Sequence, residues 1–202
     1  MWRLWIFVTD FGDTAVTIPL AFAVFAILAA YRQYRLTLGW AATIVSCAAA
    51  IGGLKIGLAA CANCIAISGL ASPSGHTAMS AAVYLSLAVI LAGPLPIPWR
   101  RVMLGGAAGL VLAIAWSRIA LRLHSPLEVA IGLLVGIAAF AAFRAALAQA
   151  ALARHEAPRL AAAWLGGAAL MLIALSHGTR WPAEQAIRGT AGLFQLLLPW
   201  CS

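Results

Sequence analysis

The sequence predicts an all-α membrane protein, a polytopic bundle of about six transmembrane helices with interfacial helices at both ends. Of its 202 residues, 64% are hydrophobic and only 9% are charged, and the mean hydropathy is +1.00. Soluble domains are typically about 25% charged, so this composition excludes one. Apolar runs of roughly 20 residues, long enough to cross a bilayer as helices, recur along the chain. We expect residues 1–202 to form a single membrane-embedded domain.

The predicted spans are residues 14–30, 38–60, 74–92, 102–121, 126–146 and 160–176. A Gly- and Pro-rich loop is predicted at residues 93–98, and the other connections are short, which favours antiparallel neighbours. Residues 1–8 are too short to cross and contain Trp2 and Trp5, which suit the headgroup level. Residues 183–200 have the pattern of an amphipathic helix lying on the membrane.

Arginines collect in every second predicted connection, after the first, third and fifth spans: Arg32, Arg35, Arg100, Arg101, Arg154 and Arg159. By the positive-inside rule these connections are cytoplasmic. Both termini, the 61–73 loop and the 122–125 turn are then extracytoplasmic. The net charge of +8 forms no basic stripe, so the expected partner is the lipid bilayer and no nucleic acid.

The remaining polar residues at this outer face lie at the ends of four predicted spans: Lys55, Ser74, Gly75, His76, Arg118, Arg122, His124 and Glu128. An ionisable residue within a span costs about 2.5–3.5 kcal/mol, so each requires a reason. Cations and the N–H groups of a helix N-terminus neutralise a phosphoryl group, and two histidines suffice for a nucleophile and an acid. His124 and Glu128 are four residues apart, so the carboxylate can orient the imidazole.

Each of these elements also has a structural interpretation. Ser72-Pro73 and Ser125-Pro126 are good helix starts, with serine as N-cap, and Ser125 with Glu128 forms a capping box. Arg118 and Arg122 can extend towards lipid headgroups. Asp13 is expected to cap the first span, and a role near the site is less favoured because a carboxylate repels phosphate. A disulfide between Cys61 and Cys64 is left open.

Two runs resemble the second and third signatures of the type 2 phosphatidic acid phosphatase superfamily, which includes vanadium haloperoxidases and bacterial acid phosphatases. They are Pro73-Ser74-Gly75-His76, and Ser117-Arg118 followed by His124 and Glu128. The resemblance implies that His124 is the nucleophile, through a phosphohistidine intermediate, and that Glu128 orients it. It implies that His76 is the acid for the leaving oxygen. It further implies that Lys55, Ser74, Gly75 and Arg118 bind phosphate. The sequence has no carboxylate or histidine cluster of the kind that holds a catalytic metal, so neither a metal nor a cofactor is expected.

The sequence departs from this pattern twice. The first signature has arginine and proline seven and eight residues after its lysine, where this chain has Ala62 and Asn63 after Lys55. Either Arg122, one turn beyond Arg118, supplies the missing cation, or the site has an altered substrate or activity. The second departure is Glu128, where the family usually has aspartate.

We therefore expect an integral membrane, metal-independent lipid phosphatase, in a bacterial inner membrane with its site facing the periplasm or exterior. The expected substrate is a phosphate or diphosphate monoester of a lipid: undecaprenyl diphosphate, phosphatidylglycerol phosphate, phosphatidic acid or a lipid A type. One alternative is a lipid phosphotransferase with the same intermediate. Another is a non-catalytic membrane protein that binds lipid phosphate. The sequence sets neither the lipid nor the oligomeric state.

Overall fold

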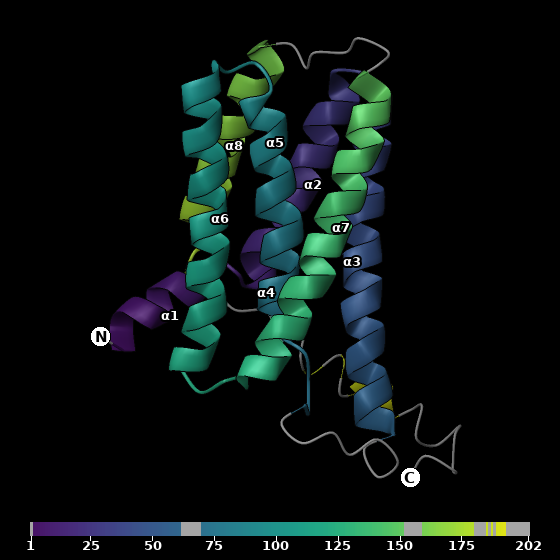
Figure 1. Cartoon of the computed structure of the whole chain (residues 1–202), viewed down its shortest axis with the longest axis vertical. Helices are drawn as coiled ribbons and strands as arrows, with labels where there is room; N and C mark the ends of the chain where they lie inside the picture. Colours follow the sequence, from purple (N-terminus) through teal and green to yellow (C-terminus); the bar gives the residue numbers. More distant parts are fainter. Residues whose placement is uncertain are drawn as a thin grey trace.

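The computed structural model describes residues 2–61, 70–151, 159–179, 185, 187 and 189–192. This part of the chain is helical and contains no strand, which confirms the predicted all-α class. Its elements are α1 (Trp2–Asp10), α2 (Thr14–Ala30), α3 (Tyr34–Ala60), α4 (Gly75–Ser80), the π-helix η1 (Ala81–Leu85), α5 (Ser86–Ala92), α6 (Ile97–Ala120), α7 (Pro126–Ala151) and α8 (Arg159–Ser176). The long helices lie side by side, and α1 projects sideways at one end of the bundle (Figure 1).

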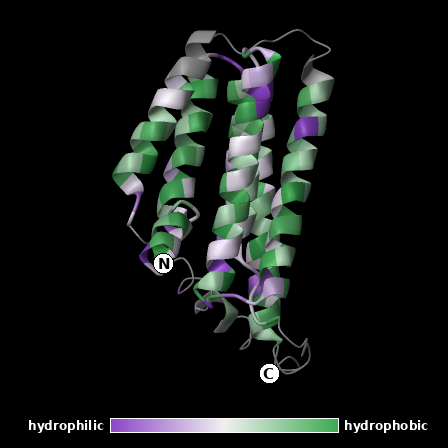
Figure 2. Ribbon diagram, turned by 60° about the vertical axis from the view of Figure 1, so that its left-hand side comes forward, coloured by the Kyte–Doolittle hydropathy of each residue, from purple (hydrophilic) through white to green (hydrophobic). Residues whose placement is uncertain are grey.

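Five described helical stretches are long and apolar enough to cross a membrane: Trp2–Ala30, Tyr34–Ala60, Gly75–Ala92, Ile97–Ala120 and Pro126–Ala148. Hydrophobic residues cover most of their length (Figure 2). Large side chains such as Phe22, Leu38 and Leu134 are about 70% exposed on the outside of the bundle, where lipid would surround them. The sixth predicted span is α8, whose apolar stretch Trp164–Ser176 is shorter. This helix packs against α2, and its crossing of the membrane stays a prediction.

Several predicted boundaries were wrong. The second span begins at Tyr34 and the fourth at Ile97, earlier than residues 38 and 102, so the predicted 93–98 loop is shorter. Pro98 lies in the first turn of α6, where a residue without a backbone N–H is tolerated. The third span is capped by Ser74, not by Ser72. The predicted amphipathic helix at 183–200 lies mostly outside the described residues. Cys61 is disulfide-bonded, and its partner also lies outside the described residues.

The helix Gly75–Ala92 lies at the centre of the bundle. Of the residues in this apolar stretch, 78% are buried inside the protein, against 22 to 44% in the other four membrane-length stretches. Its contact with α7 is tight: a Cβ at Gly132 would lie 2.4 Å from the carbonyl oxygen of Ser74, and a Cβ at Gly136 would lie 2.4 Å from that of Ala78. Two glycines four residues apart thus let the backbones of α4 and α7 touch, as in small-residue membrane helix contacts.

Candidate active site

The predicted site residues come from segments that meet at one end of the bundle, the lower end in Figure 1. The last turns of α3 and α6, the first turns of α4 and α7, and the α1–α2 junction all lie there. Lys55, Arg118 and Glu128 are buried, and His76 and His124 are partly exposed. Burial of several charged groups at one end of an apolar bundle is unfavourable unless they interact with one another or with a ligand.

His124 is oriented by Glu128. Its Nδ1 lies 3.0 Å from Glu128 Oε2. Because an ionised carboxylate only accepts hydrogen bonds, Nδ1 carries the proton and Nε2 keeps a lone pair. The predicted spacing therefore yields an imidazole prepared for nucleophilic attack through Nε2.

Glu128 also connects several segments of the chain through its carboxylate. Its carboxylate accepts four hydrogen bonds: Oε1 from the backbone N–H groups of Ala71 (2.8 Å) and Ser72 (2.6 Å), and Oε2 from Ser125 N–H (3.0 Å) and His124 Nδ1 (3.0 Å). Glu128 N–H in turn donates to Ser125 Oγ at 3.2 Å, which completes the predicted capping box. The interpretation of Glu128 as a helix cap and its interpretation as the partner of His124 are therefore compatible. One carboxylate caps α7, orients His124 and holds the chain before α4.

The phosphate-binding groups expected at the start of α4 lie beside Lys55. Ser74 is the N-cap, its Oγ accepts from Thr77 N–H at 3.4 Å, and its own N–H donates to the Glu128 carbonyl at 3.0 Å. A Cβ at Gly75 would lie 4.0 Å from Lys55 Nζ, so the ammonium group is next to the first residue of the helix. A helix N-terminus with free N–H groups and an adjacent cation is a suitable anion site.

Arg118 is buried in the last turn of α6, and its Nη1 donates to Thr9 Oγ1 at 3.0 Å. Its charge acts on both His76 and His124, so the guanidinium lies within electrostatic reach of both imidazoles. The charge of Lys55 also acts on His124. The two cations and two histidines therefore lie close enough together for their charges to interact.

Burial lowers the pKa of His124 from its ordinary value, and the positive charges of Arg118 and Lys55 lower it further. The hydrogen bond and charge of Glu128 oppose this shift without cancelling it. His124 is therefore neutral at pH 7, the state that a nucleophilic imidazole requires.

Sequence reasoning missed two contacts made by the α1–α2 junction. Asp13 caps α2 as expected, but its Oδ2 also lies 3.5 Å from His76 Nε2. Thr9 holds Arg118, as described above. The available signal was a pair of aspartates flanking Gly12 on the predicted outer side. Arg122 is exposed in the left-handed conformation (φ 55°) just after α6, and its proposed replacement of the missing arginine stays a prediction.

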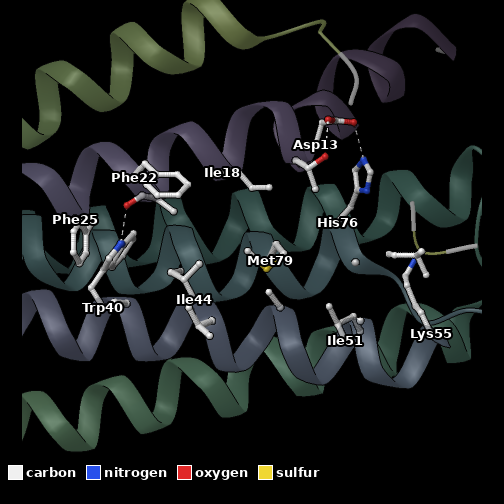
Figure 3. A pocket seen from close by; sticks show the side chains of 18 residues that line it. Asp13, Ile18, Phe22, Phe25, Trp40, Ile44, Ile51, Lys55, His76 and Met79 are labelled. Carbon is white, nitrogen blue, oxygen red and sulfur yellow. Dashed lines mark hydrogen bonds and ion pairs between the residues drawn. The ribbon is translucent and has the colours of Figure 1, made fainter. Parts of the chain in front are cut away.

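A groove of about 540 Å³ leads from this end along α2 and α3. Its polar end is formed by Asp13, Lys55, Gly75 and His76, and the rest is lined mainly by apolar side chains: Ile18, Phe22, Phe25, Trp40, Ile44 and Met79. Figure 3 shows the two ends, with Asp13, His76 and Lys55 at one and Phe25 and Trp40 at the other. The candidate site therefore joins a polar end, with groups suited to an anion, to an apolar groove.

Comparison with known proteins supports the resemblance that the sequence shows. Residues 61–152 match the model of the PAP2 superfamily, the family that the two signature runs resemble. A Klebsiella pneumoniae protein described as an uncharacterized 22.5 kDa protein in the cps region is 29% identical over an alignment of 148 positions, which covers 69% of this chain and 67% of that protein. No solved structure matches the chain.

Proposed function

We propose that this chain is a membrane phosphatase of the PAP2 superfamily, whose family model matches residues 61–152, and that it hydrolyses a phosphate or diphosphate monoester of a lipid. The observation that carries the lipid assignment is the groove: His76, Lys55 and Gly75 line its polar end, and apolar side chains line the rest. A phosphate held at the α4 N-terminus would place an attached hydrocarbon chain in this groove. A water-soluble phosphate ester would leave the apolar surface unused.

The reaction proceeds in two steps in this proposal. His124 Nε2 attacks phosphorus, the bond to the lipid oxygen breaks, and His76 gives a proton to that oxygen. Water then attacks the phosphohistidine and gives a proton to His76, and phosphate leaves as the phosphorus–nitrogen bond breaks. Lys55, Arg118 and the N–H groups of the α4 N-terminus stabilise the charge on the phosphoryl oxygens in both steps.

The proposed location is a bacterial inner membrane with the site at the periplasmic or exterior face. Its support is the arginine pattern at the end of the bundle opposite the site: Arg32 lies in the α2–α3 connection, Arg35 at the start of α3, and Arg100 and Arg101 near the start of α6. The candidate substrates are those named from the sequence, namely undecaprenyl diphosphate, phosphatidylglycerol phosphate, phosphatidic acid and lipid A phosphates.

The test is phosphate release by the purified full-length protein from each of these four lipids in detergent, with and without a divalent metal chelator. We expect release from at least one lipid and its loss in His124→Ala, with retention in a control variant, His155→Ala, in the predicted loop after the fifth span. Labelled phosphate that appears on a second added lipid would identify a phosphotransferase instead. Binding of lipid phosphate with neither release nor a trapped phosphoenzyme would overturn the catalytic proposal.

A further inference from the structure

The second histidine has its own carboxylate partner, from a part of the chain that the family match does not cover. His76 opens α4, and its Nε2 lies 3.5 Å from Oδ2 of Asp13, at the start of α2. The match begins at residue 61. Figure 3 shows Asp13 and His76 turned towards each other at the polar end of the groove.

The two histidine–carboxylate pairs differ in their relation to the groove. Asp13 and His76 both line it, whereas His124 and Glu128 are not among its lining residues. Phosphoryl transfer places the attacking and leaving groups roughly in line on opposite sides of phosphorus. With the lipid chain in the groove, the leaving oxygen lies on the side of His76 and Asp13, and His124 attacks from the other side.

We propose that Asp13 is a positioning residue for the acid His76, so that the site contains a second imidazole–carboxylate pair on the leaving-group side. This inference rests on the proposed function. With Nε2 held by Asp13, Nδ1 is the nitrogen that remains to carry the transferred proton. The lipid oxygen takes this proton as its bond to phosphorus breaks, and Nδ1 recovers a proton from the attacking water in the second step.

Helix capping alone does not explain Asp13. The cap contact is made through Oδ1, which accepts from Ala15 N–H at 2.8 Å and from Thr14 Oγ1 at 3.4 Å, whereas the oxygen that lies 3.5 Å from His76 Nε2 is Oδ2. Asp13 is only 6% exposed, and a neutral serine or asparagine caps a helix equally well without a buried charge. A carboxylate at this position has a further use when it stabilises the adjacent imidazole in its proton-donating form.

The surrounding packing fixes the geometry of the pair. A Cβ at Gly12 would lie 2.8 Å from Ile114 Cγ2, 2.9 Å from Ser80 Oγ and 3.3 Å from His76 Cβ, so the α1–α2 junction is in direct contact with α4 and α6. Asp13 N–H also donates to the Asp10 carbonyl at 3.2 Å. The backbone that carries Asp13 is therefore held in place against His76.

The test is Asp13→Asn in the full-length protein, because asparagine keeps the N-cap and removes only the charge. The substrates are an alkyl phosphate and an aryl phosphate with the same hydrocarbon tail, since an aryl oxygen leaves with little need for a proton. We expect kcat on the alkyl ester to fall roughly 10- to 100-fold, the usual effect of losing a positioning partner, and kcat on the aryl ester to change far less. Asp13→Glu should restore part of the alkyl-ester rate.

The outcomes separate this inference from the proposed function. An equal loss on both esters, or no loss on either, in an otherwise active protein would overturn the role of Asp13 and leave the phosphatase proposal in place. A wild-type protein that cleaves neither ester nor any lipid phosphate would overturn both. The aryl-ester rate itself reports whether the variant is folded, and the Tm of Asp13→Ala, which loses the cap as well, gives the size of the structural contribution.

Discussion

The carboxylate of Glu128 lies between His124 and the chain before α4: Oε2 is 3.0 Å from His124 Nδ1, and Oε1 accepts from Ala71 and Ser72 N–H. One side chain therefore connects the proposed nucleophile to the segment that carries the proposed phosphate-binding helix start. A longer side chain than aspartate suits this connection, because its two oxygens must reach different parts of the chain. This offers a physical reason for glutamate at a position where the family usually has aspartate.

We expect Glu128→Asp to retain a folded protein but to weaken both connections, since the carboxylate is shorter by one methylene. Glu128→Gln should reduce catalysis more. Both oxygens of Glu128 accept hydrogen bonds from N–H groups, so the amide NH₂ of glutamine, at either position, would face donors and could accept from neither His124 Nδ1 nor the backbone. The rate of phosphoenzyme formation should fall by roughly 10²- to 10⁴-fold in Glu128→Gln. Rapid-quench trapping of the phosphoenzyme measures it, and a wild-type rate in this variant would contradict an orienting role.

The lowered pKa of His124 predicts an acid limb in the pH dependence of kcat/KM. The proposed mechanism requires neutral His124, so kcat/KM is highest above the pKa of His124. It falls as the pH decreases through that pKa, which lies below the ordinary histidine value of about 6.5. Lys55→Gln removes one of the charges that lower this pKa, so its acid limb should move to higher pH. Arg144→Gln, which removes an exposed cation from α7, is the control and should leave the limb in place.

Gly132 and Gly136 should not tolerate a side chain. The Cβ of alanine at either position would lie 2.4 Å from a carbonyl oxygen of the α4 backbone, which cannot move away as a flexible side chain can. We expect each Gly→Ala change to lower the free energy of unfolding by about 1–3 kcal/mol. The matched controls are Gly105→Ala and Gly106→Ala on α6. The added Cβ would meet no neighbouring atom within 4 Å there, so the free energy of unfolding should be unchanged or higher. Thermal unfolding in detergent compares them.

Gly132→Ala should in addition reduce phosphate binding, because the Ser74 carbonyl that it displaces is adjacent to the helix start beside Lys55. Inhibition by inorganic phosphate or vanadate measures this effect at a temperature where the variant is folded. Unchanged inhibition with lowered stability would show that the α4–α7 contact supports the fold alone.

Filling the groove should discriminate between lipid and soluble substrates. Ala48 lines the groove on α3 and is exposed, so Ala48→Phe can narrow the groove with little effect on packing. We expect kcat/KM for a long-chain lipid phosphate to fall while that for a short-chain soluble phosphate is retained. Ala49→Phe, at the next exposed position outside the groove lining, is the control. An equal effect of Ala48→Phe on both substrates would contradict a groove for the hydrocarbon chain.

Much of this architecture was predictable because it is encoded locally. Apolar runs of membrane length gave the helices, and Ser125 with Glu128 gave the start of α7, since a capping box involves residues only three apart. The pairing of His124 with Glu128 was predictable for the same reason, because residues four apart lie on one face of a helix. The start of α4 was predicted to within one residue, but its cap is Ser74 rather than Ser72, whose N–H is held by Glu128, a residue distant in the sequence.

By itself, the sequence determined the membrane class and the helices and predicted which residues form the candidate phosphate site, because periodicity, composition and short-range spacing depend only on neighbours along the chain. Tertiary structure decided which of these residues touch. Asp13 reaches His76, and Thr9 reaches Arg118, only because the α1–α2 junction packs against α4 and α6. The groove likewise depends on how α2 and α3 diverge beside α4. Contacts between segments so far apart in the chain follow from side-chain packing, which no local pattern records.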